Sequence, residues 1–82
     1  MLIFDQFKSV RDADAFAVHV RDTFGRGART CATQAEAEEH EAFPFELRGP
    51  VVLVERDKAT GPQIEHAIKA DVKRFGGKFS GT

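Results

Sequence analysis

Tryptophan and tyrosine are absent from this chain of 82 residues, and it contains a single cysteine. One cysteine cannot form an intramolecular disulfide, so the fold does not depend on an oxidising compartment. No run of residues approaches the roughly 20 apolar positions that a membrane-spanning helix needs. A basic start followed by an apolar core, which would mark a signal peptide, is also missing. These absences predict a cytoplasmic protein with no membrane partner.

An excess of charge of one sign is missing as well. Twelve Lys and Arg oppose thirteen Asp and Glu, which gives a formal net charge of −1. Proteins that bind nucleic acids normally carry a basic excess that neutralises phosphates, so we expect no nucleic-acid partner. A chain of this length has room for one hydrophobic core, and residues 1–82 are therefore predicted to form a single domain.

Two stretches of the chain show the same order of expected elements, a strand, a helix and a second strand. Bulky and β-branched runs predict four strands, at residues 2–7, 28–32, 51–56 and 78–82. Two apolar stripes at helical spacing predict the helices between them. These stripes are Val10, Ala13, Phe16, Ala17, Val20 and Phe24 in the first helix, and Ile64, Ala67, Ile68 and Phe75 in the second.

The ends of the two predicted helices coincide when the chain is shifted by 51 positions. Ser9, a predicted N-cap, then falls on Thr60, although Gly61 is an alternative cap for the second helix. Gly25, the predicted end of the first helix, falls on Gly76. The match predicts two equivalent units in a ferredoxin-like βαββαβ sandwich, an antiparallel sheet with two helices on one face and its first and third strands in the centre.

Asp71 interrupts this repeat, because it falls on Val20 in the middle of the second apolar stripe. Charged side chains are rarely buried without a partner. We therefore favour a carboxylate near the sheet edge that is solvated or paired with an arginine. The alternative is a carboxylate that faces a cleft, with Arg29, Arg56 or Lys78 as its partner.

The connection between the two units, residues 34–50, is longer than a hairpin requires, and long connections in compact domains are usually functional or disordered. A capping box formed by Thr33 and Glu36 predicts an extra short acidic helix, and a Phe-Pro-Phe sequence follows it. One hypothesis folds Phe43, Phe45 and Leu47 over the sheet as an apolar lid. The other presents the segment to a protein partner through Glu36, Glu38, Glu39, His40, Phe43 and Phe45. Both hold if the lid is shared across a dimer.

Candidate chemistry is sparse. Glu36 and His40 stand four residues apart on one helical face, but any glutamate-rich helix with one histidine gives this spacing, so no metal site is predicted. Cys31 is predicted to be a small buried hydrophobe. His66, Lys69 and Lys73 are expected to form a solvated basic face of the second helix. We predict no catalytic residue, no cofactor and no bound metal.

The sequence favours a small non-enzymatic protein-interaction module that presents residues 34–47 to a partner. Inhibitors and adaptors of phages and mobile elements often have this size and composition. The alternative is a dimeric α+β barrel that binds a small molecule, or a minor enzyme, with Asp71 and His19 at the margin of an apolar pocket. A more remote alternative is nucleic-acid binding through the second helix.

Overall fold

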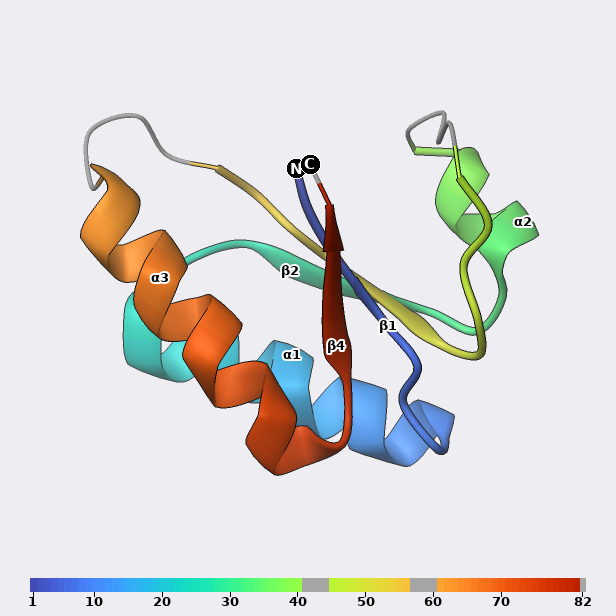
Figure 1. Ribbon diagram of the computed structural model, residues 1–82, viewed down its shortest axis with the longest axis horizontal. Coiled ribbons are helices and arrows are strands. Elements are labelled where there is room, and N and C mark those ends of the chain that lie inside the picture. Colours follow the sequence, from blue (N-terminus) through green and yellow to red (C-terminus); the bar gives the residue numbers. More distant parts are fainter. Residues whose placement is uncertain (41–44, 57–60, 82) are drawn as a thin grey trace.

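The computed structural model describes residues 1–40, 45–56 and 61–81 (Figure 1). Its elements follow one another as β1 (Leu2–Asp5), α1 (Val10–Phe24), β2 (Ala28–Cys31), α2 (Gln34–Glu38), β3 (Val51–Val54), α3 (Gly61–Asp71), the 3-10 helix η1 (Val72–Phe75) and β4 (Lys78–Gly81). Within these residues the strands form a four-stranded antiparallel sheet in the order β2-β3-β1-β4. The molecule is a small α+β protein, and the prediction that the first and third strands are central is confirmed.

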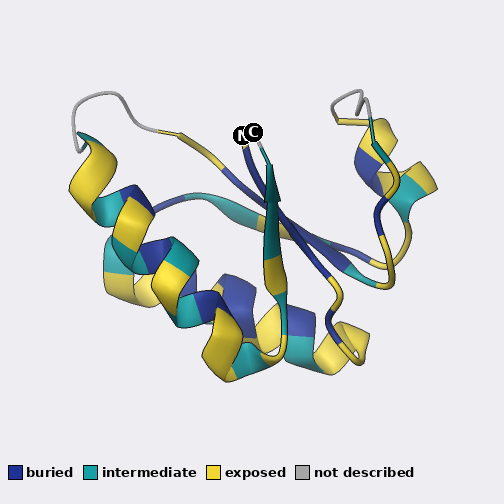
Figure 2. Ribbon diagram, viewed as in Figure 1, coloured by how far each residue is buried: buried dark blue, intermediate teal, exposed yellow. Residues whose placement is uncertain are grey.

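Burial follows this order of strands. Every residue of β1 and β3 is buried, whereas β2 and β4 are mostly half-buried or exposed (Figure 2). The central pair is joined with Ile3 opposite Leu53, and β4 places Phe79 opposite Phe4. The two runs of bulky residues lie in the centre because both of their faces are covered there.

α1 begins and ends where the sequence predicts. The Ser9 side chain accepts a hydrogen bond from the Asp12 backbone N–H at 3.1 Å, and Gly25 ends the helix in the left-handed conformation, with a φ of 64°. Its buried residues are Ala13, Phe16, Ala17 and Val20. The predicted stripe is too long at its start, because Val10 is 49% exposed.

The face that α3 buries overlaps the predicted stripe but is rotated from it: Ile68 is in the main core, and Ile64 and Phe75 pack against it, as predicted. The buried residues are Glu65 and Ile68 in α3 and Val72 in η1, while Ile64 and Ala67 are half-buried. After Asp71 the helix tightens into the 3-10 form, which changes the direction of the side chains that follow. Gly76 then ends it with a φ of 80°, as predicted. The N-cap predicted at Thr60 lies outside the described residues.

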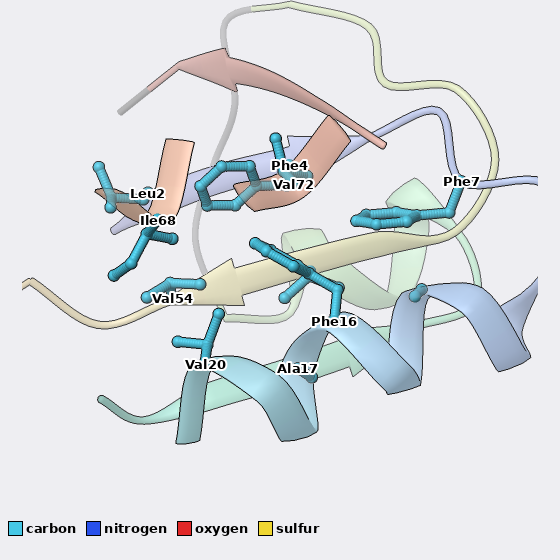
Figure 3. Packing of buried hydrophobic residues seen from close by; sticks show 11 residues of the cluster. Leu2, Phe4, Phe7, Phe16, Ala17, Val20, Val54, Ile68 and Val72 are labelled. Atoms are coloured by element: carbon cyan, nitrogen blue, oxygen red, sulfur yellow. The ribbon is translucent and has the colours of Figure 1, made fainter. Parts of the chain in front are cut away.

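The main core lies between the sheet and the two long helices, which share one face of it (Figure 1). Phe16 of α1 occupies its centre, with its ring centroid 5.0 Å from that of Phe4 and 5.7 Å from that of Phe7 (Figure 3). The Phe75 ring of η1 lies 5.5 Å from it. Such offset and edge-on aromatic contacts are favourable beyond the area that they bury. Both helices therefore meet in a single aromatic-rich core.

The opposite face of the sheet is covered by the connection between β2 and β3. A second buried cluster contains Ile3, Cys31, Ala37, Leu47, Val51 and Leu53. Phe45 packs against it while staying half-buried. α2 and the chain that returns from it thus form a partial third layer, in agreement with the lid hypothesis for Phe45 and Leu47. Phe43 lies outside the described residues.

Candidate functional site

The connection between β2 and β3 is held in place by specific hydrogen bonds. Thr33 caps α2, its side chain accepting from the Glu36 N–H at 3.3 Å, and the Glu36 carboxylate accepts from the Ala32 N–H at 2.6 Å. Gln34 donates to the Phe45 carbonyl at 3.2 Å and accepts from the Leu47 N–H at 2.8 Å. One amide side chain therefore ties the start of α2 to the returning chain. The sequence analysis missed Gln34, since nothing local marks a residue whose partners lie more than ten positions away.

The outer side of α2 carries the predicted acidic residues. Glu36, Glu38 and Glu39 are exposed, whereas Ala37 between them is fully buried. The Glu38 carboxylate accepts from the Gln34 amide at 2.8 Å, which aligns it along the helix. We call Glu36, Glu38 and Glu39 the acidic surface. The backbone that carries this surface packs against the sheet, because Ala37 of the same short helix belongs to the second core cluster.

Two other predicted contact residues have partners within the chain. Nε2 of His40 lies 3.2 Å from a guanidinium nitrogen of Arg29 on β2, and since arginine can only donate, this nitrogen accepts. The ring of Phe45 approaches β4, because a Cβ on Gly81 would lie 3.1 Å from its Cζ. Phe45 therefore mainly covers the sheet, whereas the acidic surface and His40 are the exposed residues of the predicted contact segment among those that the structure describes.

Asp71 has a partner that the sequence analysis did not choose. Its carboxylate lies 2.7 Å from Nε2 of His19, and Nδ1 of His19 lies 3.3 Å from the Thr23 hydroxyl. The side chains of His19 and Asp71 are 19% and 25% exposed. The favoured prediction of a partly solvated carboxylate agrees with this exposure, but the partner is a histidine and not an arginine, nor is it Arg29, Arg56 or Lys78 of the cleft alternative, since α3 lies beside α1.

The order threonine, histidine, aspartate is also the order of a nucleophile, its base and an orienting group. Here Thr23 stands one helical turn from His19 on α1, a spacing at which any helical pair is adjacent. The His19 ring packs between Phe24 and Phe75, at centroid distances of 5.8 and 5.1 Å. The three side chains therefore form a hydrogen-bonded contact between α1 and α3 at the edge of the core.

An ion pair holds the first half of α3. Arg56 donates two hydrogen bonds to the Glu65 carboxylate, at 3.0 and 3.1 Å. These bonds lower the pKa of Glu65 below its ordinary value; burial opposes the shift, and the charges of Arg56, Arg26 and Lys69 add to it. The burial of Glu65 was not predicted. The bidentate contact with Arg56 offsets the free-energy cost of burying the Glu65 carboxylate.

Asp5 and Cys31 are the titratable side chains buried beside the connection. The Asp5 carboxylate accepts from the Arg48 N–H at 2.7 Å and from the Ser80 hydroxyl, which joins β1 to the connection and to β4. Cys31 is 1% exposed, as predicted for a small hydrophobe. Burial raises the pKa of its thiol, with Glu36 and Glu39 adding to the effect and Arg29 opposing it. A raised pKa keeps the thiol protonated and unreactive.

Metal ligands do not converge in residues 1–40, 45–56 and 61–81: no three His, Cys, Asp or Glu side chains are placed there to hold an ion. In the same part of the chain no helix combines the length and the apolar character needed to cross a bilayer. No protein-family model, curated protein or solved structure matches the chain.

Proposed function

We propose that the protein is a small non-enzymatic interaction module that binds a basic protein partner through the acidic surface on α2. The observation that carries this proposal is the placement of three exposed carboxylates, two on α2 and one at its C-cap residue Glu39. The other side of this short helix is buried, and Gln34 binds the chain that returns from it. Binding to such a surface orders little of the chain, so little of the interaction energy is lost to entropy.

The scaffold that we propose for this surface is a ferredoxin-like sandwich. The strand order β2-β3-β1-β4, the antiparallel neighbours and the two helices on one face support it. In that topology β2 and β3 can be joined by a short hairpin. The segment around α2 is then an addition that the scaffold itself does not require, which favours a role in binding.

Charge supports a basic partner. The acidic surface places three carboxylates close together on a chain whose net charge is only −1. Carboxylates arranged in this way speed the encounter with a positive surface and disfavour acidic competitors. We therefore expect the association to weaken steeply as the salt concentration rises.

The alternative of a dimeric small-molecule binder ranks lower. Dimers of this type pair their sheets face to face, and α2, Phe45 and Leu47 occupy part of the face that would be paired. Sedimentation over a wide range of protein concentration distinguishes the two: a persistent monomer counts against the dimer.

The interaction proposal is tested by charge reversal on two surfaces. A photo-crosslinking residue placed at Glu46, which is exposed beside the acidic surface, captures contacts in cells of the native host. We expect one dominant crosslinked protein, lost in Glu38→Lys/Glu39→Lys and kept in Asp22→Lys, an exposed control on α1. Recovery of the same crosslinked protein from the double variant contradicts the proposal.

A further inference from the structure

A groove runs between the end of α3 and the start of β4, on the face of the sheet that carries α1 and α3. Its volume is about 500 Å³, within the range of small-molecule sites. Lys69, Lys73 and Lys78 line it together with Val72 and Phe79, and Gln6 lies at its edge. The acidic surface belongs to the opposite face of the sheet, so this groove is a separate feature.

The groove concentrates positive charge. Three lysines, from α3, η1 and β4, line it, although the whole chain has a net charge of −1. Among the residues that the structure describes, none of these ammonium groups forms an ion pair with a carboxylate. Lys69 acts on Glu65 only through its charge, and both oxygens of Asp5, the cross-strand neighbour of Lys78, accept other hydrogen bonds. The three cations are therefore available to an external anion.

The floor of the groove is apolar. Val72 belongs to the main core and Phe79 packs against it while half-buried. The ammonium of Lys69 lies 4.3 Å from the centroid of the Phe79 ring, a cation–π contact that holds one charge over an apolar surface. A ligand that combines a negative head with a flat apolar body matches both parts of the groove.

The backbone that lines one part of the groove has an unusual geometry. Gln6 adopts a φ of 66°, which non-glycine residues rarely do. Gly77 lies so close to Phe7 that a Cβ there would be 2.4 Å from the ring. Gln6 and Gly77 both line the groove, so the strained conformation and this close contact lie in its wall.

We propose that this groove binds a small organic anion, with a phosphate or carboxylate head held by Lys69, Lys73 and Lys78 and an aromatic body over Val72 and Phe79. The site is independent of the interaction proposed for α2. Phenyl phosphate is the probe, and its two matched controls are inorganic phosphate, which lacks the ring, and benzyl alcohol, which lacks the charge.

The test follows amide chemical shifts of the isotope-labelled full chain during titration with each compound. We expect phenyl phosphate to shift the amides of Lys69, Val72 and Lys78 and to bind about tenfold more tightly than either control, since each control removes about one favourable contact. Shifts that are spread over the surface, or equal affinity for inorganic phosphate, overturn the proposed site.

Variants with one positive charge fewer separate the groove from general electrostatics. Lys73→Gln and Lys78→Gln are each expected to weaken phenyl phosphate binding about three- to tenfold, the effect of one charge-assisted hydrogen bond. Arg11→Gln, an exposed change on α1 outside the groove, is expected to change it by less than about twofold because solvent screens it. Equal weakening in all three variants overturns the assignment, and unchanged melting temperatures show that the variants remain folded.

Discussion

The two helices that cover the main core come from corresponding positions of the two chain halves, and they bury different faces. α1 buries Val20, whereas its counterpart in the other half, Asp71, stays one-quarter exposed and pairs with His19. In the opposite sense, Glu65 is buried against Arg56 while its counterpart on α1, Asp14, is exposed and accepts a hydrogen bond from Thr30. Equal left-handed glycines at their ends therefore do not make two helices equivalent. Their polar residues decide which side faces the sheet.

The strands show a smaller difference of the same kind. Ala28 of β2 pairs with Val54 of β3. If the two halves were equivalent under the shift of 51 positions, their counterparts Phe79 of β4 and Ile3 of β1 would form a pair. The structure instead pairs Phe79 with Phe4, and the register shifts again between Ile3 and Phe4. β4 is thus displaced by one residue relative to its counterpart. The displacement accompanies a shorter connection, since two residues separate η1 from β4 whereas three separate α1 from β2.

The largest expected effect on the free energy of unfolding comes from Val20 and Asp71, the corresponding positions whose environments differ most. Val20→Asp places an unpaired carboxylate in the core and is expected to cost about 3 to 5 kcal/mol of the free energy of unfolding. Asp71→Val is expected to cost only about 1 kcal/mol, because the half-buried His19 loses one hydrogen-bond partner. Urea unfolding of both variants measures the difference. Equal costs would show that the two positions share one environment.

The shared feature of the halves is tested at the glycines that end the helices. Gly25 and Gly76 are both left-handed, and a Cβ on either would meet no atom within 4 Å. Gly25→Ala and Gly76→Ala should therefore each lower the free energy of unfolding by about 1 kcal/mol, from backbone conformation alone. Thermal or urea unfolding gives both values. A difference greater than about twofold between them would break this part of the equivalence.

The smallest expected effect is a pH dependence confined to the second half. The folded-state pKa of Glu65 is lowered, chiefly by Arg56, so its contribution to stability is present above the ordinary carboxyl pKa of about 4.3 and is lost as the pH falls through the lowered value. Arg56→Gln should thus be less stable than the parent chain at pH 7, with the gap closing towards pH 3. Melting temperatures across this range measure the gap, and Arg11→Gln is the control. A gap that persists unchanged at pH 3 contradicts the linkage.

Local sequence patterns predicted most of the fold. The strands, the caps at Ser9 and Thr33 and the ends at Gly25 and Gly76 depend on a few neighbouring residues, and they lie where expected. The face of α3 was predicted in part: Ile64, Ile68 and Phe75 contact the core, but the burial of Glu65 and Val72 was missed because it depends on partners distant in sequence. The candidate site was predicted in part: α2 and its exposed carboxylates were expected, whereas the role of Gln34 was not.

Periodicity and capping act within a turn or two of helix, and for this reason the amino-acid order alone specified the elements, their order and the extra acidic helix. Only the packed molecule decided which carboxylates are buried with a cation, which are exposed, and how three lysines from α3, η1 and β4 come to line one groove. The physical reason is that desolvation and pairing depend on groups that folding brings together from distant positions. A local pattern carries no information about such partners.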